Sequence, residues 1–412
     1  MELSRPSEEV RPLDRAPGVR LHGGTAMLAA SVVLALVFVA ANLPGPLYVL
    51  YAERFGFSEL VLTVVYAVYV IGSILAVTIF GRIADQIGRR PVLLLSIVLC
   101  AASAVVFFLT FNTATLLTAR VVSGLALGLT ATACTAWIAE LQPDGDRRIA
   151  TLFATGANLT GLALGPLIAG LLAQFAPAPL RLPYIIYFVG LVVPALVVWT
   201  VHETVKSKRP WSELSFRPRL GVPEEIAGRF IAPAVAAFVA FAVMGFYSAL
   251  IPTLLEKGLK IASPAAGGGV TCFFFACGVA AIALSARLPS RATMLCGLGL
   301  LVPGVVLLVL AQPLGSLAAL LVSSAIGGPA SALGYRGSLQ VINEIAPADR
   351  RAETISTYLL VCYCGVSLPV IGIGLLSRPA GEQLADIGFA ALLCIFAFAA
   401  FLTDRHYGGE AR

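Results

Sequence analysis

Long apolar stretches separated by short polar or Pro/Gly-rich breaks dominate the chain. A stretch such as AMLAASVVLALVFVAAN is continuously apolar and lacks the alternation typical of a membrane β-barrel strand. A helix needs about 20 apolar residues to cross a bilayer core of about 30 Å. The pattern predicts twelve such helices, near residues 27–50, 60–80, 92–111, 114–139, 149–173, 183–201, 230–255, 265–286, 292–311, 314–342, 353–376 and 386–403.

The composition excludes an ordinary soluble protein. Charged residues make up 12% of the 412 residues, against about 25% in soluble domains, and the mean hydropathy is +0.91. Twelve spans leave room for loops but not for a large soluble domain. We therefore expect an all-α polytopic membrane protein with twelve transmembrane helices, surrounded mainly by the lipid bilayer.

Basic residues follow the positive-inside pattern of membrane proteins. If both termini are cytoplasmic, 21 of the 28 lysines and arginines fall on the cytoplasmic face, with Arg336 expected as a twenty-second. This bias places a multi-pass protein in the cell membrane with both termini inside. The net charge of +6 then requires no nucleic-acid partner. The opposite face receives five basic residues: Arg54, Arg181, Lys257, Lys260 and Arg378.

The chain divides into two similar halves. ELQPDGDRRIAT after the fourth apolar run matches EIAPADRRAET after the tenth, about half a chain later. Parallel repeats of this kind place a substrate cavity at their interface, near the bilayer midplane. The expected organisation is a cytoplasmic tail (1–26), a six-helix bundle (27–201), a cytoplasmic linker (202–229), a second six-helix bundle (230–403) and a cytoplasmic tail (404–412).

The loop after the second apolar run reads GRIADQIGRR. It resembles the signature of the major facilitator superfamily in the same loop, G-x-L-A-D-x-x-G-R-R/K, with Ile83 in place of the usual leucine. The resemblance implies two six-helix bundles and a loop that latches them together on the cytoplasmic side when the carrier opens outward. The alternative is a positive-inside loop without a gating role. The residues assigned to gating here are Gly81, Asp85, Gly88, Arg89 and Arg90.

A second match to the family is Arg120, which opens RVVSGLALG in the fourth run. An arginine at bilayer depth costs about 2.5 to 3.5 kcal/mol on insertion scales, so we expect it to face a cavity or a partner. We predict that Arg120 is a cavity residue with a role in substrate binding or coupling. The alternative is that it lies near the outer end of its helix and snorkels to water. Ser324 is its counterpart in the second half, which predicts that the halves differ in function.

The fifth run carries Gly161, Gly165 and Pro166. Small residues four apart let helices pack closely, and proline bends a helix. This resembles the glycine-proline motif of the drug and metabolite antiporters of the family, which favours export over uptake.

Few polar side chains fall inside the apolar runs. An intramembrane amide needs a partner, and tyrosine combines an apolar face with a polar tip. For each such residue, ordinary helix packing is an alternative to substrate contact. Their apolar, aromatic character favours a lipophilic small-molecule substrate. The candidates for substrate contact are Asn42, Tyr66, Asn158, Tyr247 and Tyr358.

No acidic residue is expected near the bilayer midplane, although a buried carboxylate is the usual proton carrier. Proton coupling is therefore weighed against facilitated diffusion and against direct coupling to a charged substrate. If protons are coupled, the gate residues Glu53 and Asp85 are the expected carriers, because their exposure should alternate between states. Glu59, Glu140 and Asp386 are the other acids near the helix ends.

These features predict a secondary-active transporter that exports hydrophobic small molecules, such as drugs or a natural product, by alternating access and in exchange for protons. Uptake or facilitated diffusion of a small metabolite is the alternative, and a non-transporting membrane receptor is an alternative from another class. The sequence has no phosphate-binding loop and no metal-ligand spacing, so we expect no enzyme activity, no cofactor and no metal. We expect the protein to function as a monomer.

Overall fold

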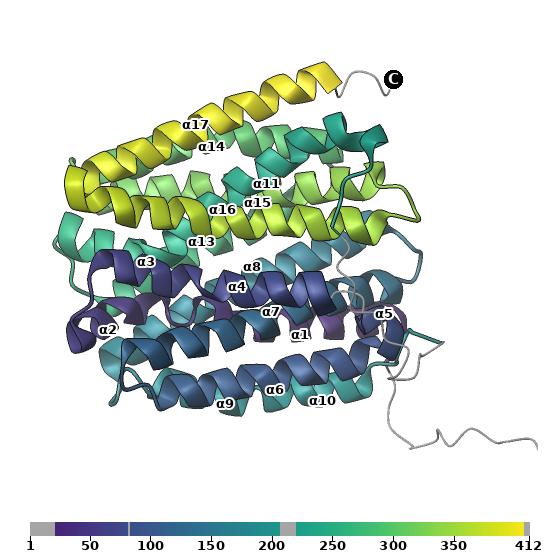
Figure 1. Cartoon of the computed structure of the whole chain (residues 1–412), viewed down its shortest axis with the longest axis horizontal. Helices are drawn as coiled ribbons and strands as arrows, with labels where there is room; N and C mark the ends of the chain where they lie inside the picture. The colour runs from purple at the N-terminus through teal and green to yellow at the C-terminus, as the bar shows by residue number, and fades with distance from the viewer. Residues whose placement is uncertain (1–20, 81–82, 207–219, 408–412) are drawn as a thin grey trace, which may run out of the picture.

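The computed structural model describes residues 21–80, 83–206 and 220–407, and within them the chain is helical almost throughout. Two stacked groups of helices make up the molecule, α1 to α10 in one and α11 to α17 in the other (Figure 1). Twelve helical segments of the described residues are long and apolar enough to cross a membrane, as predicted.

The first group contains α1 (Gly23–Asn42), α2 (Tyr48–Phe55), α3 (Glu59–Ala67), α4 (Tyr69–Leu75), α5 (Ile83–Ile87), α6 (Arg89–Phe108), α7 (Thr113–Leu141), α8 (Arg147–Phe175), α9 (Leu182–Gly190) and α10 (Val192–Thr200). The second contains α11 (Ala227–Ala249), α12 (Ile251–Thr253), α13 (Pro264–Leu284), α14 (Ser290–Ala311), α15 (Leu317–Ile345), α16 (Arg351–Ala380) and α17 (Glu382–Tyr407). Short 3-10 or π-helical turns add η1 (Gly45–Leu47), η2 (Ala76–Phe80), η4 (Glu224–Ile226) and η5 (Leu254–Gly258).

Two differences from the predicted boundaries have clear causes. The first span runs from Gly23 to Phe55 and is interrupted after Asn42, where Pro44 and Pro46 cannot donate main-chain hydrogen bonds. The last helix continues to Tyr407, so the first residues of the expected C-terminal tail are helical. Asp404 in this last turn forms an ion pair with Arg291 of α14, with 2.9 Å between Arg291 Nε and Asp404 Oδ2. This pair ties the end of α17 to α14.

The internal repeat is visible in the helix boundaries. Adding 204 to the bounds of α7, Thr113–Leu141, gives those of α15, Leu317–Ile345. The residue before each helix, Asn112 or Ser316, has a side chain that accepts a hydrogen bond from a main-chain N–H of the first turn. The two halves therefore contain helices of the same length at equivalent positions in the repeat.

Glycines bring helices into backbone contact. A Cβ added to Gly161 of α8 would lie 2.3 Å from the Ala35 carbonyl oxygen of α1, and one added to Gly165 would lie 2.5 Å from the Val39 carbonyl oxygen. Between the halves, a Cβ on Gly268 of α13 would lie 2.2 Å from the Pro166 carbonyl oxygen. A side chain larger than hydrogen at these positions would push α8 away from both neighbours.

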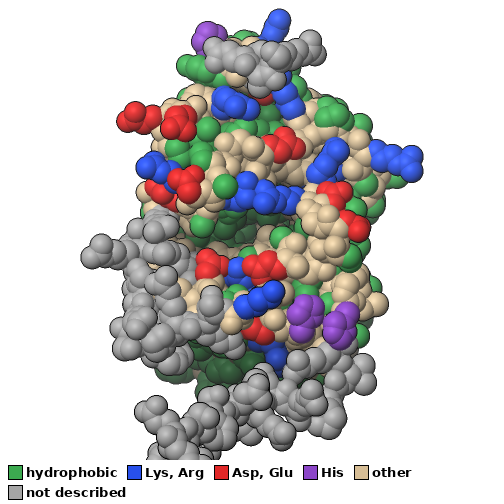
Figure 2. All heavy atoms as spheres, turned by 90° about the vertical axis from the view of Figure 1, so that its right-hand side faces the viewer, with side chains coloured by type: hydrophobic (Ala, Val, Ile, Leu, Met, Phe, Trp, Pro, Cys, Tyr) green, Lys and Arg blue, Asp and Glu red, His purple; other side chains and the backbone are tan. Residues whose placement is uncertain are grey.

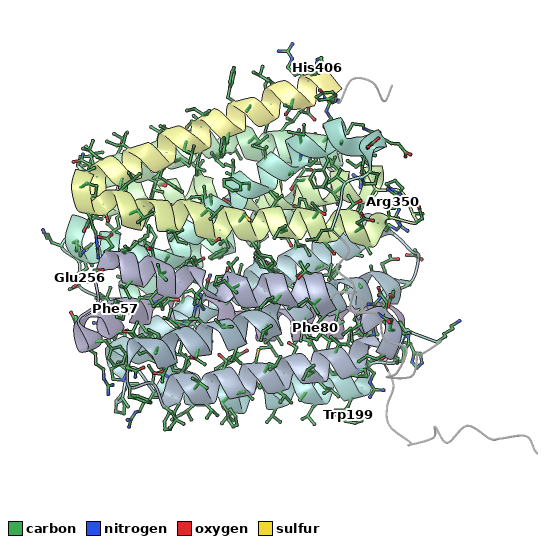
Figure 3. All side chains as sticks on the ribbon, in the orientation of Figure 1. Phe57, Phe80, Trp199, Glu256, Arg350 and His406 are labelled. Carbon is green, nitrogen blue, oxygen red and sulfur yellow. The ribbon has the colours of Figure 1, made fainter. Side chains whose placement is uncertain are left out.

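The helix stack has two opposite ends. Figure 3 labels Glu256 and Phe57 at one end and Arg350 and His406 at the other. We call the end with Arg350 the latch end, because α5 with Asp85 also lies there (Figure 1). We call the end with Glu256 the closed end.

Candidate functional site

A cavity of 340 Å³ lies between the two halves. It is bounded by α1, α5, α6, α7 and α8 of the first half and by α15 and α16 of the second. Its lining reaches from charged residues of the latch end, such as Asp85 and Arg351, to apolar residues such as Leu34, Leu339 and Leu359. Viewed from the latch end, the molecule is hollowed between its halves, with side chains of both charges along the edges (Figure 2).

A second cavity of 60 Å³ lies beside the first. Both are lined by Asn158, Tyr335 and Leu359, so the two volumes are adjacent. No charged side chain of the described residues lines the second cavity. Its wall contains many aromatic rings, those of Phe38, Tyr66, Tyr69, Phe241, Phe275, Tyr335 and Tyr363.

The halves are joined at the closed end by charged side chains. Lys257 pairs with Glu382 of α17 at 2.9 Å and with Glu59 of α3 at 3.5 Å. Partial burial opposes the lysine charge, but the two carboxylates outweigh it and raise the pKa of Lys257 above its ordinary value. Asp386 lines the same small space as Glu59 and Glu382.

Further contacts across the closed end involve α3 and α16. Arg378 Nη2 donates a hydrogen bond to Ser58 Oγ at 2.8 Å, and a Cβ added to Gly374 would lie 2.3 Å from Thr63 Oγ1. At the latch end, Arg148 Nη2 donates across the halves to the Leu288 carbonyl oxygen at 2.9 Å. Beside this contact, the hollow seen in Figure 2 places the cavity mouth at the latch end, while α3 and α16 are in contact at the other end.

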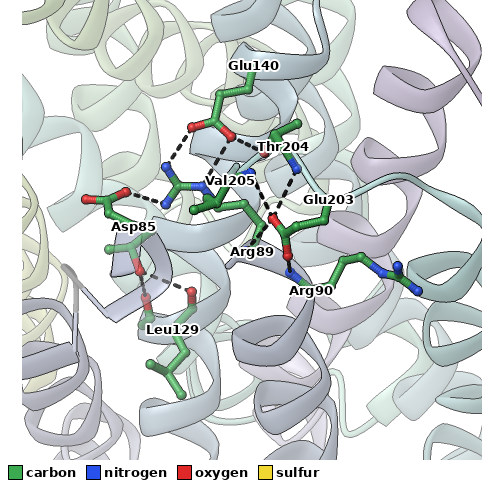
Figure 4. Close-up of polar contacts among 10 residues, drawn as sticks. Asp85, Arg89, Arg90, Leu129, Glu140, Glu203, Thr204 and Val205 are labelled. Carbon is green, nitrogen blue, oxygen red and sulfur yellow. Dashed lines mark hydrogen bonds and ion pairs between the residues drawn. The ribbon is translucent and has the colours of Figure 1, made fainter. Parts of the chain in front are cut away.

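The predicted latch loop forms an ion-pair network around Arg89 (Figure 4). Arg89 Nη1 contacts Asp85 Oδ1 at 2.6 Å, and Nη2 contacts Glu140 Oε1 at 2.6 Å. Arg89 Nε also donates to the other Glu140 oxygen at 3.3 Å, and Thr204 donates its hydroxyl to that oxygen. The Arg89 side chain is buried, whereas Asp85 keeps half of its side chain exposed at the cavity.

Glu203 completes this network, and the sequence analysis did not identify it. Its carboxylate accepts hydrogen bonds from the main-chain N–H groups of Arg89 at 2.9 Å and Arg90 at 3.0 Å. It therefore caps the N-terminus of α6 from the segment that follows α10, where a negative charge is favourable. Gly88, with φ of 112°, turns the chain into α6, and a Cβ there would lie 2.4 Å from a Glu203 oxygen.

The remaining latch residues occupy different positions. Arg90 donates to the carbonyl oxygens of Val198 at 3.1 Å and Trp199 at 3.2 Å, so it holds α10 and does not line the cavity. Gly81 lies outside the described residues.

Arg120 is completely buried, which contradicts the snorkelling alternative. Its guanidinium donates to the carbonyl oxygens of Ala41 at 3.1 Å, Val65 at 3.3 Å and Tyr66 at 3.0 Å. These carbonyls lie in the last turns of α1 and α3, where the helix leaves such groups without main-chain donors. A positive charge is also favourable at helix C-termini.

Arg120 therefore has a partner of the expected kind, but it lines neither cavity. Instead it lies behind the aromatic wall, 4.5 Å from the ring centre of Tyr69 and 5.6 Å from that of Tyr66. Its counterpart in the second half, Ser324, donates a hydrogen bond to the hydroxyl of Tyr247 at 3.3 Å. The two positions thus differ in chemistry, as the sequence comparison predicts.

Asn42 and Pro166 are linked through the main chain. Pro166 has no N–H, so the Leu162 carbonyl oxygen of α8 lacks its usual helical donor. Asn42 Nδ2 donates to this oxygen at 3.2 Å and also lines the aromatic cavity. The glycine-proline motif therefore creates a polar contact between α8 and α1 beside the cavity.

The other candidate contact residues separate into two groups. Asn158 lines both cavities and Tyr66 lines the aromatic one. Tyr247 bonds Ser323 at 2.9 Å and Tyr358 bonds Ser338 at 2.8 Å, and both lie outside the cavity linings. Glu53 lies on the exposed face of α2, also outside these linings.

Comparisons with known proteins agree with this architecture. The human organic anion transporter MFSD10 has a similar structure, with a TM-score of 0.70 and 16% identity over 91% of this chain and 98% of that one. The quinolone resistance protein NorA of Staphylococcus aureus is 23% identical over 42% of this chain and 44% of its own length. Monosaccharide-sensing protein 3 of Arabidopsis thaliana is 33% identical over 33% of this chain and 20% of its own length.

The match with each of these two curated relatives spans less than half of the relative's length. The model of the Major Facilitator Superfamily, in contrast, matches residues 30–368, which is most of the chain. Together with the twelve spans, this confirms the predicted fold. The chain therefore belongs to the major facilitator superfamily, a family of membrane transporters and not of enzymes.

Proposed function

We propose that this transporter exports hydrophobic small molecules, such as drugs or natural products, from the cytoplasm by alternating access. The observation that carries the proposal is the largely apolar 340 Å³ cavity, which opens at the latch end while contacts join the halves at the closed end. Such a cavity can receive a lipophilic molecule from one side of the membrane only.

The orientation of the cavity in the cell membrane rests on charge. The loops of the latch end carry most of the basic residues, and the positive-inside rule then places this end and both termini in the cytoplasm. In this orientation the cavity faces inward. The segment 202–229 serves as the cytoplasmic linker between the bundles.

Export, and membership of the drug and metabolite antiporter branch, are supported by two features. Gly161, Gly165 and Pro166 form the glycine-proline motif in α8, and NorA, a quinolone resistance protein, is among the similar sequences. The similarity to a monosaccharide-sensing protein keeps uptake of a small metabolite as the second candidate.

The latch gives the inward and outward states different contacts. Asp85 and Arg351 line the cavity from opposite halves, Asp85 from α5 and Arg351 from the first turn of α16. When the closed end opens, the latch end narrows and the free face of Asp85 meets the start of α16. A contact made in one state only shifts the population toward that state.

Proton exchange belongs to the proposal, with Asp85 as the best-supported carrier among the predicted ones. Asp85 lines the cavity and lies at the gate, so its exposure changes between states. Glu53 lies on an exposed helix face outside the two cavities and has no comparable support. The protein needs no second copy for this cycle, and we propose that it works as a monomer.

The direction of flux in oriented vesicles tests the proposed function. A labelled lipophilic substrate should leave the cytoplasmic side, and an imposed pH gradient should accelerate its movement. Flux only toward the cytoplasmic side would support metabolite uptake, and efflux that ignores the gradient would remove proton exchange. Binding without flux in either direction would support a receptor.

A further inference from the structure

We infer that the cavity takes an amphipathic organic anion, with a flat apolar body among the aromatic residues and an acidic group between Arg147 and Arg351. This inference rests on the proposed function, because it treats the two adjacent cavities as one substrate site. A combined lining that is apolar at one end and cationic at the other selects against neutral and cationic molecules of the same shape.

The cationic end is formed by one arginine from each half. Arg147, the first residue of α8, and Arg351, the first residue of α16, both line the larger cavity. Neither forms an ion pair with any carboxylate in the part of the chain that the structure describes. The Nε atom of Arg351 is buried and has no hydrogen-bond partner there. Two guanidinium groups with spare donors suit the oxygens of a carboxylate or sulfonate.

The carboxylates at the same cavity do not cancel this charge. Asp85 and Glu140 both line the cavity, but each is paired with Arg89 at 2.6 Å. Arg89 and these two acids together carry one negative charge, and Arg147 and Arg351 carry two positive ones. The charged lining is therefore positive overall, with its unpaired donors on Arg147 and Arg351.

The aromatic end also disfavours cations. A ring can bind a cation on its face, but Arg120 already lies 4.5 Å from the ring centre of Tyr69 and no described carboxylate pairs with it. A second positive charge in this cavity would be repelled across a region of low dielectric constant. A flat apolar body meets no such cost and can stack on Tyr66, Tyr69 or Tyr363.

Asn158 connects the two ends. It lines both cavities, and its amide has no hydrogen-bond partner among the described residues. A polar atom in the middle of the ligand could use this amide, which would fix the ligand lengthwise. The combined cavity is of the size that holds drug-sized ligands, roughly 300 to 1,000 Å³.

The test compares three ligands that share one aromatic body: 2-naphthoate, 2-naphthamide and 2-naphthyltrimethylammonium. Calorimetric titration of the full-length protein in phosphatidylcholine nanodiscs measures their affinities without competing anionic lipid headgroups. We expect 2-naphthoate to bind most tightly and the ammonium compound least. Repeating the titration with added phosphatidylglycerol tests whether an anionic lipid competes for the same arginines.

Variants assign the preference to the two arginines. In the double variant Arg147→Gln/Arg351→Gln, the affinity for 2-naphthoate should fall about tenfold, the combined effect of two partly solvated charge contacts. The affinity for 2-naphthamide should stay within about twofold, which also reports that the variant is folded. Arg350→Gln removes the same charge from the neighbouring residue, which does not line the cavity, and should leave all three affinities unchanged.

Several results would overturn the inference. These are equal or tighter binding of the neutral or cationic ligand, no binding of any of the three, or an equal loss for 2-naphthoate and 2-naphthamide in the double variant. The ranking in the native protein is decisive even if the variants fail to fold. A preference for the anion without flux in vesicles would support this inference and contradict the proposed export. Efflux without a preference for the anion would support the proposed export and contradict this inference.

Discussion

Arg120 Nη1 donates a hydrogen bond to the Ala41 carbonyl oxygen across 3.1 Å, which joins α7 to the end of α1. The same guanidinium reaches two carbonyls of α3, so one side chain holds three helices of the first half. All of its acceptors are main-chain atoms.

Arg120→Ala should lower the stability of the protein and abolish transport. The substitution removes three charged hydrogen bonds from a buried site, and each is worth about 1.5 to 3 kcal/mol. Arg120→Lys should retain part of both properties, because an ammonium group keeps the charge but not the planar set of donors. Thermal unfolding and vesicle flux measure the two effects, with exposed Arg181→Ala as the control. Normal stability and flux in Arg120→Ala would contradict the assigned role.

Asp85→Asn should leave membrane insertion intact and impair transport. The amide keeps the shape of the side chain but loses the charge that pairs with Arg89 and that faces the start of α16 across the cavity. Arg89→Ala should have the larger effect, because it also frees Glu140. Expression and flux are measured together, with exposed Glu225→Gln as the control. Native flux in well-expressed Asp85→Asn would remove the latch assignment.

Glu203→Ala should destabilise the start of α6 by about 1 kcal/mol, the usual effect of losing a helix-capping side chain. It also releases the segment after α10 from the latch, because Glu203 accepts from the main chain of both Arg89 and Arg90. Hydrogen exchange of residues 89–93 should speed up selectively. Unchanged exchange there would show that the cap contributes nothing to the stability of α6.

Lys257→Met should shift the population toward the state in which the two halves separate at the closed end. The substitution leaves Glu59 and Glu382 without their shared cation, and the two carboxylates then repel each other across the halves. A cysteine introduced at Thr253 should become more reactive toward a membrane-impermeant reagent. Lys260→Met, in the exposed loop after η5, is the matched control. Equal labelling in all three backgrounds would contradict this gating role.

The same ion pairs predict a pH dependence. Because the pKa of Lys257 is raised, the stabilisation of the closed end is complete below the ordinary lysine value of 10.5 and is lost as the pH rises through the raised value. Cysteine labelling at Thr253 should therefore increase above pH 10.5 in the native background and not in Lys257→Met. The effect should weaken in high salt, since half of the Lys257 side chain is exposed.

Asn42 and Pro166 should be energetically coupled. Asn42→Ala leaves the Leu162 carbonyl oxygen without a donor in the native background, but in Pro166→Ala the restored main-chain N–H can satisfy it. The stability loss from Asn42→Ala should therefore be about 1 kcal/mol smaller in the Pro166→Ala background. A double-mutant cycle by thermal unfolding measures the difference. Additive effects would show that the two residues act independently.

The sequence predicts the spans well, because they are local patterns, and the residues of the latch hypothesis are also local. Twenty apolar residues cross a bilayer whatever their neighbours are, and Asp85, Arg89 and Arg90 lie within one short loop. The partners that complete the site are distant in sequence. Glu203 is more than 100 residues from Arg89, and nothing in its local sequence marks it as a helix cap.

Other contacts escape the sequence because they involve the main chain. The carbonyl acceptors of Arg120 exist at every residue, so side-chain identity cannot reveal them. Tyr247 and Tyr358 match the pattern of a polar tip on an aromatic ring, but serines on the neighbouring helix satisfy their hydroxyls. Both serines lie on α15, and the sequence alone does not reveal that its serine-bearing faces contact α11 and α16.

The ion-pair cluster of the closed end, Glu59, Lys257 and Glu382, shares no residue with the two larger cavities of the described chain. Substitutions in this cluster can change how often the closed end opens without changing what the cavities bind. Turnover rate and substrate range can therefore diverge independently among descendants of this protein. Selection for faster opening of the closed end need not change which molecules the cavities bind.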